Sequence, residues 1–248
     1  ESTFYRKQNE AIDHLTQMVQ TLEAQAQDER KARLLRRLDA RTYVTLIGVD
    51  EPLAHLDALL HTTAPPSIIL LEGMGGLGKT SLADALVRQL IDANAFADVG
   101  WVTARQQLFN LGGSVKAAVT PALTTEVLIE TLLAQLIAEL PRSALTSPEQ
   151  ARQLLASRLR DQPHLIVIDN LETLADVESL LPLLRDLANP TKFVLTSRNS
   201  FFGETGIYHF SVPELSPTHA LQLARYEATL SNLPQVAQAS DADLSPIL

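Results

Sequence analysis

The chain has 248 residues, of which 46% are hydrophobic, so it can bury the core of one large domain or two modest ones. Its formal net charge of −9 argues against nucleic acid as the main partner, and the lack of cysteine excludes disulfides and zinc–thiolate sites while suiting a reducing compartment. Because no apolar run approaches the roughly 18 residues of a membrane span and the polar N-terminus has no signal-peptide core, we expect a soluble, cytoplasmic protein.

Residues 1–41 contain neither glycine nor proline and predict a helix. Apolar residues recur in this segment at spacings of three and four, which is the helical period: Ile12, Leu15, Val19, Leu22 and Ala26. A charge-dense run follows at 28–41. Two interpretations stay open: an amphipathic helix folded onto its own domain, or a linker or oligomerising helix that joins an upstream domain.

From Val44 onward, short β-like runs alternate with longer helical stretches. We expect strands at 67–72, 99–104, 164–169, 192–197 and 207–212, and helices at 79–92, 125–140, 148–160, 174–188 and 217–230. Continuous apolar strands separated by helices are typical of a parallel sheet buried on both faces. The prediction is a three-layer α/β domain with a parallel five-stranded sheet, preceded by an N-terminal helix. Ser147 is expected to cap the helix that begins at Pro148, and 109–123 to form a loop.

The stretch "GMGGLGKT" (73–80) satisfies G-x-x-x-x-G-K-[ST] and lies between an expected strand and an expected helix. Its glycines allow successive backbone N–H groups to form an anion-binding nest, and the helix N-terminus adds its dipole. We expect Lys79 to contact the β- and γ-phosphates, Thr80 to bind Mg²⁺ and Ser81 to reach the α-phosphate. The predicted phosphate-binding residues are Gly73, Met74, Gly75, Gly76, Leu77, Gly78, Lys79, Thr80 and Ser81. The chain is therefore predicted to be a P-loop NTPase.

An acidic residue follows a second buried strand, "HLIVIDN" (164–170). Asp169 is expected at the carboxyl end of this strand, where open α/β sheets bind ligands, and to hold Mg²⁺ together with Thr80. The next residue, Asn170, can orient a water through its amide but cannot take its proton. Glu172 is an alternative base. We expect ATP hydrolysis that is slow.

A third strand, "FVLTSRN" (193–199), ends in Thr196, Ser197 and Arg198, whose side chains can meet a γ-phosphate. A guanidinium binds phosphate oxygens bidentately, so Arg198 is predicted to report whether the third phosphate is present. The predicted catalytic residues are Lys79, Asp169, Asn170 and Arg198.

These motifs in this order resemble the STAND class of signal-transduction ATPases, which contains the NB-ARC and NACHT modules of cell-death and immune receptors. The similarity is greatest to bacterial proteins of the NB-ARC (AP-ATPase) type. It covers about 45–230 and rests on segments 45–60, 73–83, 96–104, 165–172, 193–198 and 212–223. The resemblance implies that Ile47, Gly48 and Val49 hold adenine through backbone contacts. One departure is that Val49 and Asp50 follow Gly48 where the family usually has Arg-Glu, which removes an arginine from that position.

The resemblance implies a nucleotide switch: ADP holds a closed monomer, and exchange for ATP opens it for self-association. It divides the chain into an N-terminal helical segment or linker (1–41), a nucleotide-binding domain (42–216) and the start of a helical domain (217–248). In this family a helical domain with a Gly-x-Pro motif follows, and winged-helix, sensor and effector domains come after it. None of these occurs up to 240–248, so the chain is expected to be a fragment of a larger protein. The expected ligands are ATP, ADP and Mg²⁺, with no membrane or nucleic-acid partner for this part.

Other classes remain as alternatives. A remodelling or loader ATPase of the AAA+ type would favour an acidic residue at position 170, which is Asn170 here. A small-molecule kinase would need an arginine-rich lid, and the segment 105–123 offers only Arg105 and Lys116. The chain can also be the ATPase module of a transcriptional regulator. The six histidines lack metal-site spacing and are expected to be structural or surface residues.

Overall fold

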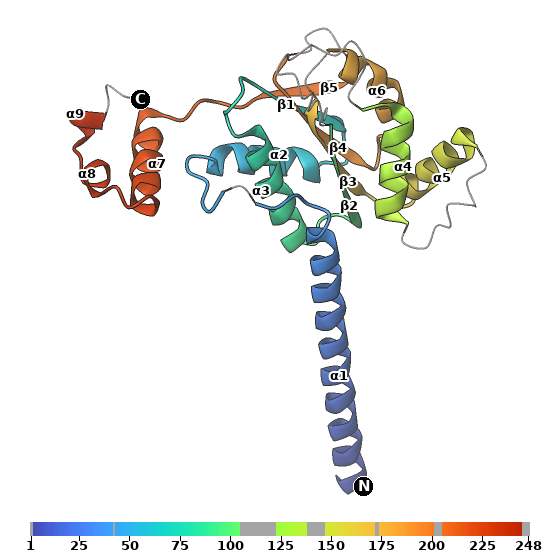
Figure 1. Ribbon diagram of the computed structural model, residues 1–248. Helices are drawn as coiled ribbons and strands as arrows, with labels where there is room; N and C mark the ends of the chain where they lie inside the picture. The colour runs from blue at the N-terminus through green and yellow to red at the C-terminus, as the bar shows by residue number, and fades with distance from the viewer. Residues whose placement is uncertain are drawn as a thin grey trace, which may run out of the picture. The chain divides into compact units, whose positions relative to one another are not determined.

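A computed structural model of the chain describes residues 2–41, 43–104, 123–137, 147–171, 174–200 and 205–244 (Figure 1). The chain divides into two compact units, Glu1–Asp39 and Ala40–Leu248. Most of the predicted loop at 109–123, the last residues of the predicted helix at 125–140, and Glu172 lie outside the described residues.

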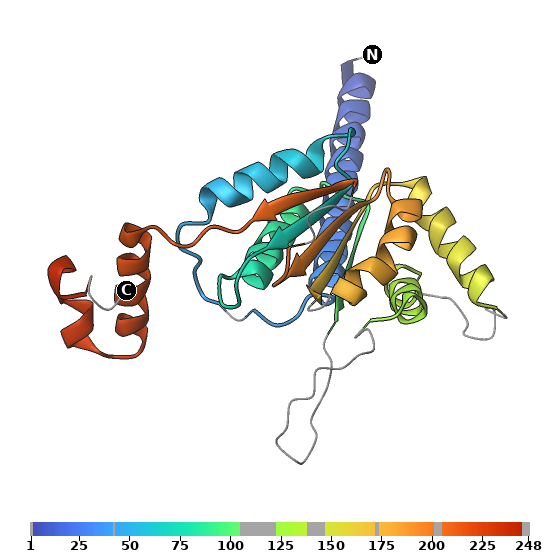
Figure 2. The ribbon, with the colours of Figure 1, turned by 90° about the horizontal axis from the view of Figure 1, so that it is seen from above.

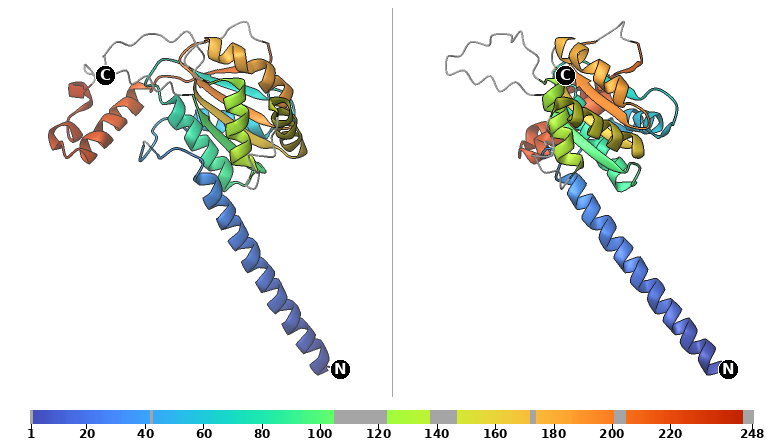
Figure 3. Two further views of the ribbon diagram at one scale, coloured as in Figure 1. Left: turned by 45° about the vertical axis from the view of Figure 1, so that its right-hand side comes forward. Right: turned by 90° about the vertical axis from the view of Figure 1, so that its right-hand side faces the viewer.

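The first unit contains α1 (Ser2–Leu35), one continuous helix of 34 residues (Figure 3). It confirms the predicted N-terminal helix. Residues three and four apart are neighbours on a helix surface, so the predicted apolar positions line one side of α1. On that side, Ile12, Leu15, Val19 and Leu22 are 51–61% exposed. Within the described part of the chain, neither α1 nor any other helix has the apolar length that crossing a membrane would take.

The second unit is built on one sheet of five parallel strands, as predicted. The strands are β1 (Ile68–Glu72), β2 (Asp98–Thr103), β3 (His164–Leu171), β4 (Lys192–Ser197) and β5 (Ile207–Ser211). Their order is β2-β3-β4-β1-β5, and every pair is parallel. Strands β1 and β4 are buried along their whole length, because helices cover both faces of the sheet. The order places β4 between the strand that precedes the P-loop and the strand that carries Asp169.

Helices form the two outer layers (Figure 1 and Figure 2). They are α2 (Asp50–His61), α3 (Lys79–Asp92), α4 (Thr125–Leu136), α5 (Pro148–Asp161) and α6 (Leu174–Leu187). On one face, α4, α5 and α6 share a core with alternate strand residues such as Leu70, Ile168 and Phe193. On the other face lies α3, with α2 packed against it. The predicted cap of α5 is confirmed, since Ser147 Oγ accepts a hydrogen bond from Gln150 N at 3.3 Å.

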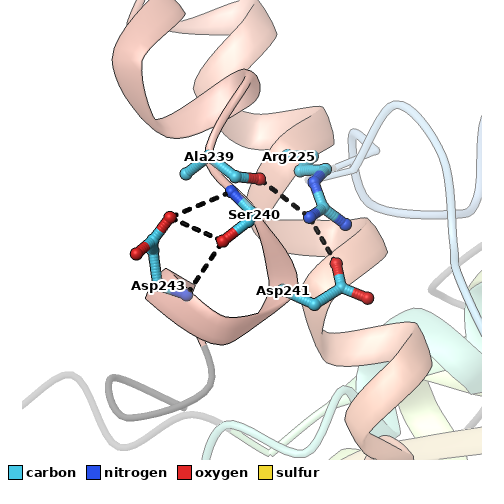
Figure 4. Close-up of polar contacts among 5 residues, drawn as sticks. All are labelled: Arg225, Ala239, Ser240, Asp241 and Asp243. Atoms are coloured by element: carbon cyan, nitrogen blue, oxygen red, sulfur yellow. Dashed lines mark hydrogen bonds and ion pairs between the residues drawn. The ribbon is translucent and has the colours of Figure 1, made fainter.

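The last described part of the chain forms three helices, α7 (Pro217–Leu230), α8 (Pro234–Ala237) and α9 (Asp241–Leu244). Figure 4 shows the polar contacts that join α7 to α9 and cap α9. Arg225 of α7 donates to the carbonyl of Ala239 at 2.9 Å and to Asp241 Oδ1 at 2.5 Å. Ser240 caps α9, because its Oγ donates to Asp243 Oδ2 at 2.6 Å and accepts from Asp243 N at 3.3 Å. The predicted division of the chain into 1–41, 42–216 and 217–248 remains a prediction.

Candidate nucleotide-binding site

The predicted P-loop connects β1 to α3 at the carboxyl edge of the sheet. Gly76 and Gly78 have φ angles of +90° and +82°, and no heavy atom lies within 4 Å of a Cβ built on either. These positions therefore need glycine for its backbone conformation and not for lack of space. Gly78 is the N-cap of α3, and its carbonyl accepts from Leu82 N at 2.7 Å. The first amides of a helix have no intrahelical partner, so α3 directs them at this loop.

Lys79 begins α3 and folds back across the loop. Its Nζ donates to the carbonyls of Gly73 at 2.7 Å and Met74 at 2.6 Å. An ammonium has three N–H donors, so the geometry keeps one for a phosphate oxygen. Burial is the main effect that lowers the pKa of Lys79; the nearby charge of Arg198 lowers it further, and Asp169 opposes both. The ammonium is thus held at the mouth of the nest by main-chain oxygens.

The structure places Asp169 and Thr80, the two predicted magnesium ligands, side by side. Thr80 Oγ1 donates to Asp169 Oδ1 at 2.8 Å, and Asp169 is 1% exposed. A carboxylate and a hydroxyl side by side are oxygen ligands of the kind that Mg²⁺ prefers, with phosphate oxygens and waters completing its shell. The pair fits the expected metal.

Thr196 has a function that the sequence did not reveal. Its Oγ1 donates to Asp169 Oδ1 at 2.6 Å and accepts from Asn170 N at 2.8 Å. This side chain was expected to meet a γ-phosphate, yet its hydroxyl is engaged on the neighbouring strand and orients Asp169. The contact exists because β4 is the neighbour of β3 in the sheet.

A β-bulge in β3 accompanies this contact. The pairing of β3 with β4 shifts register between Ile168 and Leu171, and Asn170 has a φ of +67°. Bulges of this kind re-aim side chains near functional sites. Here the bulge lets Asn170 line the cavity beside the P-loop while its backbone N–H binds Thr196.

A cavity of about 290 Å³ lies between the P-loop and the ends of β3 and β4. It is lined by Gly75, Gly76, Gly78, Lys79, Thr80, Ser81, Asn170, Thr196, Ser197 and Arg198. Arg198 reaches over the loop, since a Cβ on Gly75 would lie 3.8 Å from its Nε. Two cations and a helix N-terminus on one cavity favour a polyanion. Within the loop, Cδ1 of Leu77 lies 3.1 Å from a Cβ built on Gly73.

The predicted adenine segment lies outside the lining of this cavity. Gly48 has a φ of +72°, and a Cβ there would be 2.5 Å from Nδ1 of His219, so this imidazole from α7 lies directly against the backbone between Ile47 and Val49. No motif in the sequence singled out His219. The segment is anchored to α3 by Tyr43, whose hydroxyl donates to Asp84 Oδ2 at 2.7 Å. Burial and then the Asp84 carboxylate raise the pKa of Tyr43 to about 12.

Together, the strand–loop–helix, the Thr80–Asp169 pair and the sheet order define a P-loop NTPase. Residues 45–198 match the family described as the AAA ATPase domain, and the chain belongs to that family. A comparison with curated proteins gave no match. Nucleotide binding and hydrolysis are therefore the general activity of the domain.

The fold is similar to that of a STAND protein with a tetratricopeptide repeat sensor from Pyrococcus horikoshii. The identity is 17% and the TM-score 0.50, over 84% of this chain and 28% of that one. PCH-2 of C. elegans is 14% identical with a TM-score of 0.40, over 78% of this chain and 48% of its own. A DNA replication initiation factor is 13% identical with a TM-score of 0.44, over 83% and 57%. The chain thus spans about a quarter to just over half of these proteins. The family model thus shows an AAA-type P-loop ATPase domain, and the STAND protein shares its fold.

Proposed function

We propose that the chain is the nucleotide-binding module of a STAND-type switch that binds ATP and ADP with Mg²⁺ and hydrolyses ATP slowly. The observation that carries the proposal is that Lys79 and Thr80 line one cavity at the carboxyl edge of the sheet, and that the buried Asp169 carboxylate accepts a hydrogen bond from Thr80. Thr80 and Asp169 would hold Mg²⁺, which would neutralise charge on the phosphates. Asn170 can orient a water but cannot accept its proton, which favours slow turnover.

The switch requires a residue that distinguishes ATP from ADP, because a ligand shifts an equilibrium only by its differential affinity for the two states. Arg198 is our candidate, since it extends over Gly75 from the end of β4 and lines the cavity. A guanidinium there would bind oxygens of the third phosphate and have no counterpart to bind in ADP.

A matched pair of lysine variants tests nucleotide binding. Lys192, like Lys79, is buried and donates to two backbone carbonyls, those of Ala64 at 3.1 Å and Pro66 at 2.9 Å. It lies at the other end of the sheet, at the start of β4. We expect titration calorimetry to show ADP and ATP binding to wild type and to Lys192→Met but not to Lys79→Met. Equal binding to both variants, or none to wild type, would contradict the proposal.

We further propose that the intact protein self-associates and that α1 contributes to this. Its exposed apolar residues repeat as a heptad, with β-branched Ile12 and Val19 at one seam position and Leu15 and Leu22 at the other. This distribution favours a two-stranded parallel coiled coil. The next seam position towards the C-terminus is Ala26.

The absence of cysteine in the chain allows a direct test of the helix pairing. Two Ala26→Cys chains would form a disulfide in a parallel pair, because the residue faces its own copy. In an antiparallel pair the two would be about 30 Å apart. Ala24→Cys, on the outer side, is the matched control. Cross-linking is measured with an ATP analogue and with ADP, and we expect Ala26→Cys but not Ala24→Cys to cross-link. Equal cross-linking of both variants, or none of either, would refute the parallel pairing.

A further inference from the structure

A buried carboxylate that the mechanism does not use lies directly beneath the P-loop. Glu72 is the last residue of β1, immediately before Gly73, and is only 4% exposed. Its Oε2 accepts from Ser200 Oγ at 2.7 Å and lies 3.0 Å from Nδ1 of His209. Its Oε1 accepts from Ser211 Oγ at 3.2 Å. A carboxylate buried this deeply is costly unless it is hydrogen-bonded, and here three side chains serve it.

The partners of Glu72 lie on both sides of β1. Ser200 belongs to the segment that follows β4, and His209 and Ser211 belong to β5 on the opposite side. Register explains the second group, because Glu72 pairs with Ser211 and side chains in register on parallel strands share a face. One carboxylate therefore joins the ends of three strands at the root of the loop.

The hydrogen bonds also keep Glu72 ionised. Burial, the largest single effect, raises its pKa, but the hydrogen bonds from His209, Ser200 and Ser211 together outweigh it and hold the pKa below its ordinary value. An ionised acceptor makes stronger hydrogen bonds than a neutral one. The contact to Ser200 is thus a charge-assisted anchor for the segment after β4.

Arg198 lies in that anchored segment, between the end of β4 and Ser200. We propose that Glu72 is a positioning residue that holds this segment so that the Arg198 guanidinium stays over the P-loop. The inference rests on the proposed role of Arg198 in detecting the third phosphate. Through Ser211 the same carboxylate holds the end of β5, from which the chain runs through 212–216 into α7. The phosphate-sensing arginine and the strand that leads to the helical segment therefore share one anchor.

The test compares the affinities for ADP and a non-hydrolysable ATP analogue, measured by calorimetry on the full chain. Ser200→Ala removes the anchor with little change in volume, Ser200→Thr keeps the hydroxyl, and Glu72→Gln removes the charge. Asp84→Asn is the matched control, because Asp84 is also a buried carboxylate that accepts from two side chains, those of Tyr43 and Arg88.

We expect Ser200→Ala and Glu72→Gln to lower the ratio of ATP-analogue affinity to ADP affinity about tenfold, while ADP affinity changes by less than about twofold. Ser200→Thr should retain the wild-type ratio of affinities. Asp84→Asn should lower the melting temperature but leave this ratio unchanged. A ratio unchanged in Ser200→Ala, or both affinities falling together, would overturn the inference and leave the proposed function intact. A wild-type chain that binds neither nucleotide would overturn both.

Discussion

Replacing Thr196 by valine tests the contact that orients Asp169. The substitution keeps the shape of a side chain that is 2% exposed but removes its hydroxyl. Two hydrogen bonds are lost: the one donated to Asp169 at 2.6 Å and the one accepted from Asn170 N at 2.8 Å. A bond to a charged group contributes about 1.5–3 kcal/mol, and an unsatisfied buried donor costs about 1–3 kcal/mol. Because the bulge can relax around Asn170, we expect the free energy of unfolding to fall by about 3 kcal/mol.

The assay is urea unfolding followed by the fluorescence of Trp101. This is the only tryptophan in the chain and lies buried in β2, so it reports on the sheet that carries the site. With a denaturant slope of about 2 kcal/mol per molar, the unfolding midpoint should fall by about 1.5 M. Thr196→Ser is the control, since it keeps the hydroxyl and removes one methyl group, at a cost of about 1 kcal/mol. If the two variants differ by less than about 0.5 kcal/mol, the hydroxyl does not have the role inferred here.

Three further predictions concern contacts around the site. Gly48→Ala should lower the free energy of unfolding by about 1–2 kcal/mol because residue 48 has a left-handed backbone, and its new Cβ should also displace His219. In urea unfolding, adding His219→Ala should restore only the stability lost to the clash with His219. In a pH titration at 295 nm, the signal lost in Tyr43→Phe should have its midpoint at about 12. Because the folded chain holds this proton more tightly than the unfolded one, the stability from the contact with Asp84 is intact below about pH 10 and is lost as the pH rises through about 12; a Tyr43 midpoint near 10 would contradict this. Ser147→Ala should lower the stability of α5 by about 1 kcal/mol, measured by hydrogen exchange in the first turn of α5. Ser216→Ala, which removes the cap of α7, is the control and should leave exchange in α5 unchanged.

Local signals in the sequence were sufficient for the five strands, most of the helices and the P-loop, but α2, α8 and α9 were not predicted. Hydrophobic runs and periods predicted all five strands within two residues of their ends, and the Gly-Lys-Thr motif predicted where α3 begins. These features depend on neighbouring residues: the propensity of an apolar run, the positive φ that glycine permits, and the missing partners of a helix's first amides. Asp169 could be predicted because a carboxylate at the end of a buried strand needs a polar environment at the sheet edge.

Contacts between distant segments depended on the order of the strands, which no local pattern encodes. With the order β2-β3-β4-β1-β5, β4 lies between β1 and β3, and only this arrangement brings Thr196 to Asp169 and Ser200 to Glu72. His219 reaches Gly48 by packing of α7 against a loop far away in the sequence. Sequence alone therefore predicted most of the groups that line the cavity, because those groups belong to short motifs. The tertiary structure decided which of them hold one another in place, because that follows from which strands become neighbours and not from spacing along the chain.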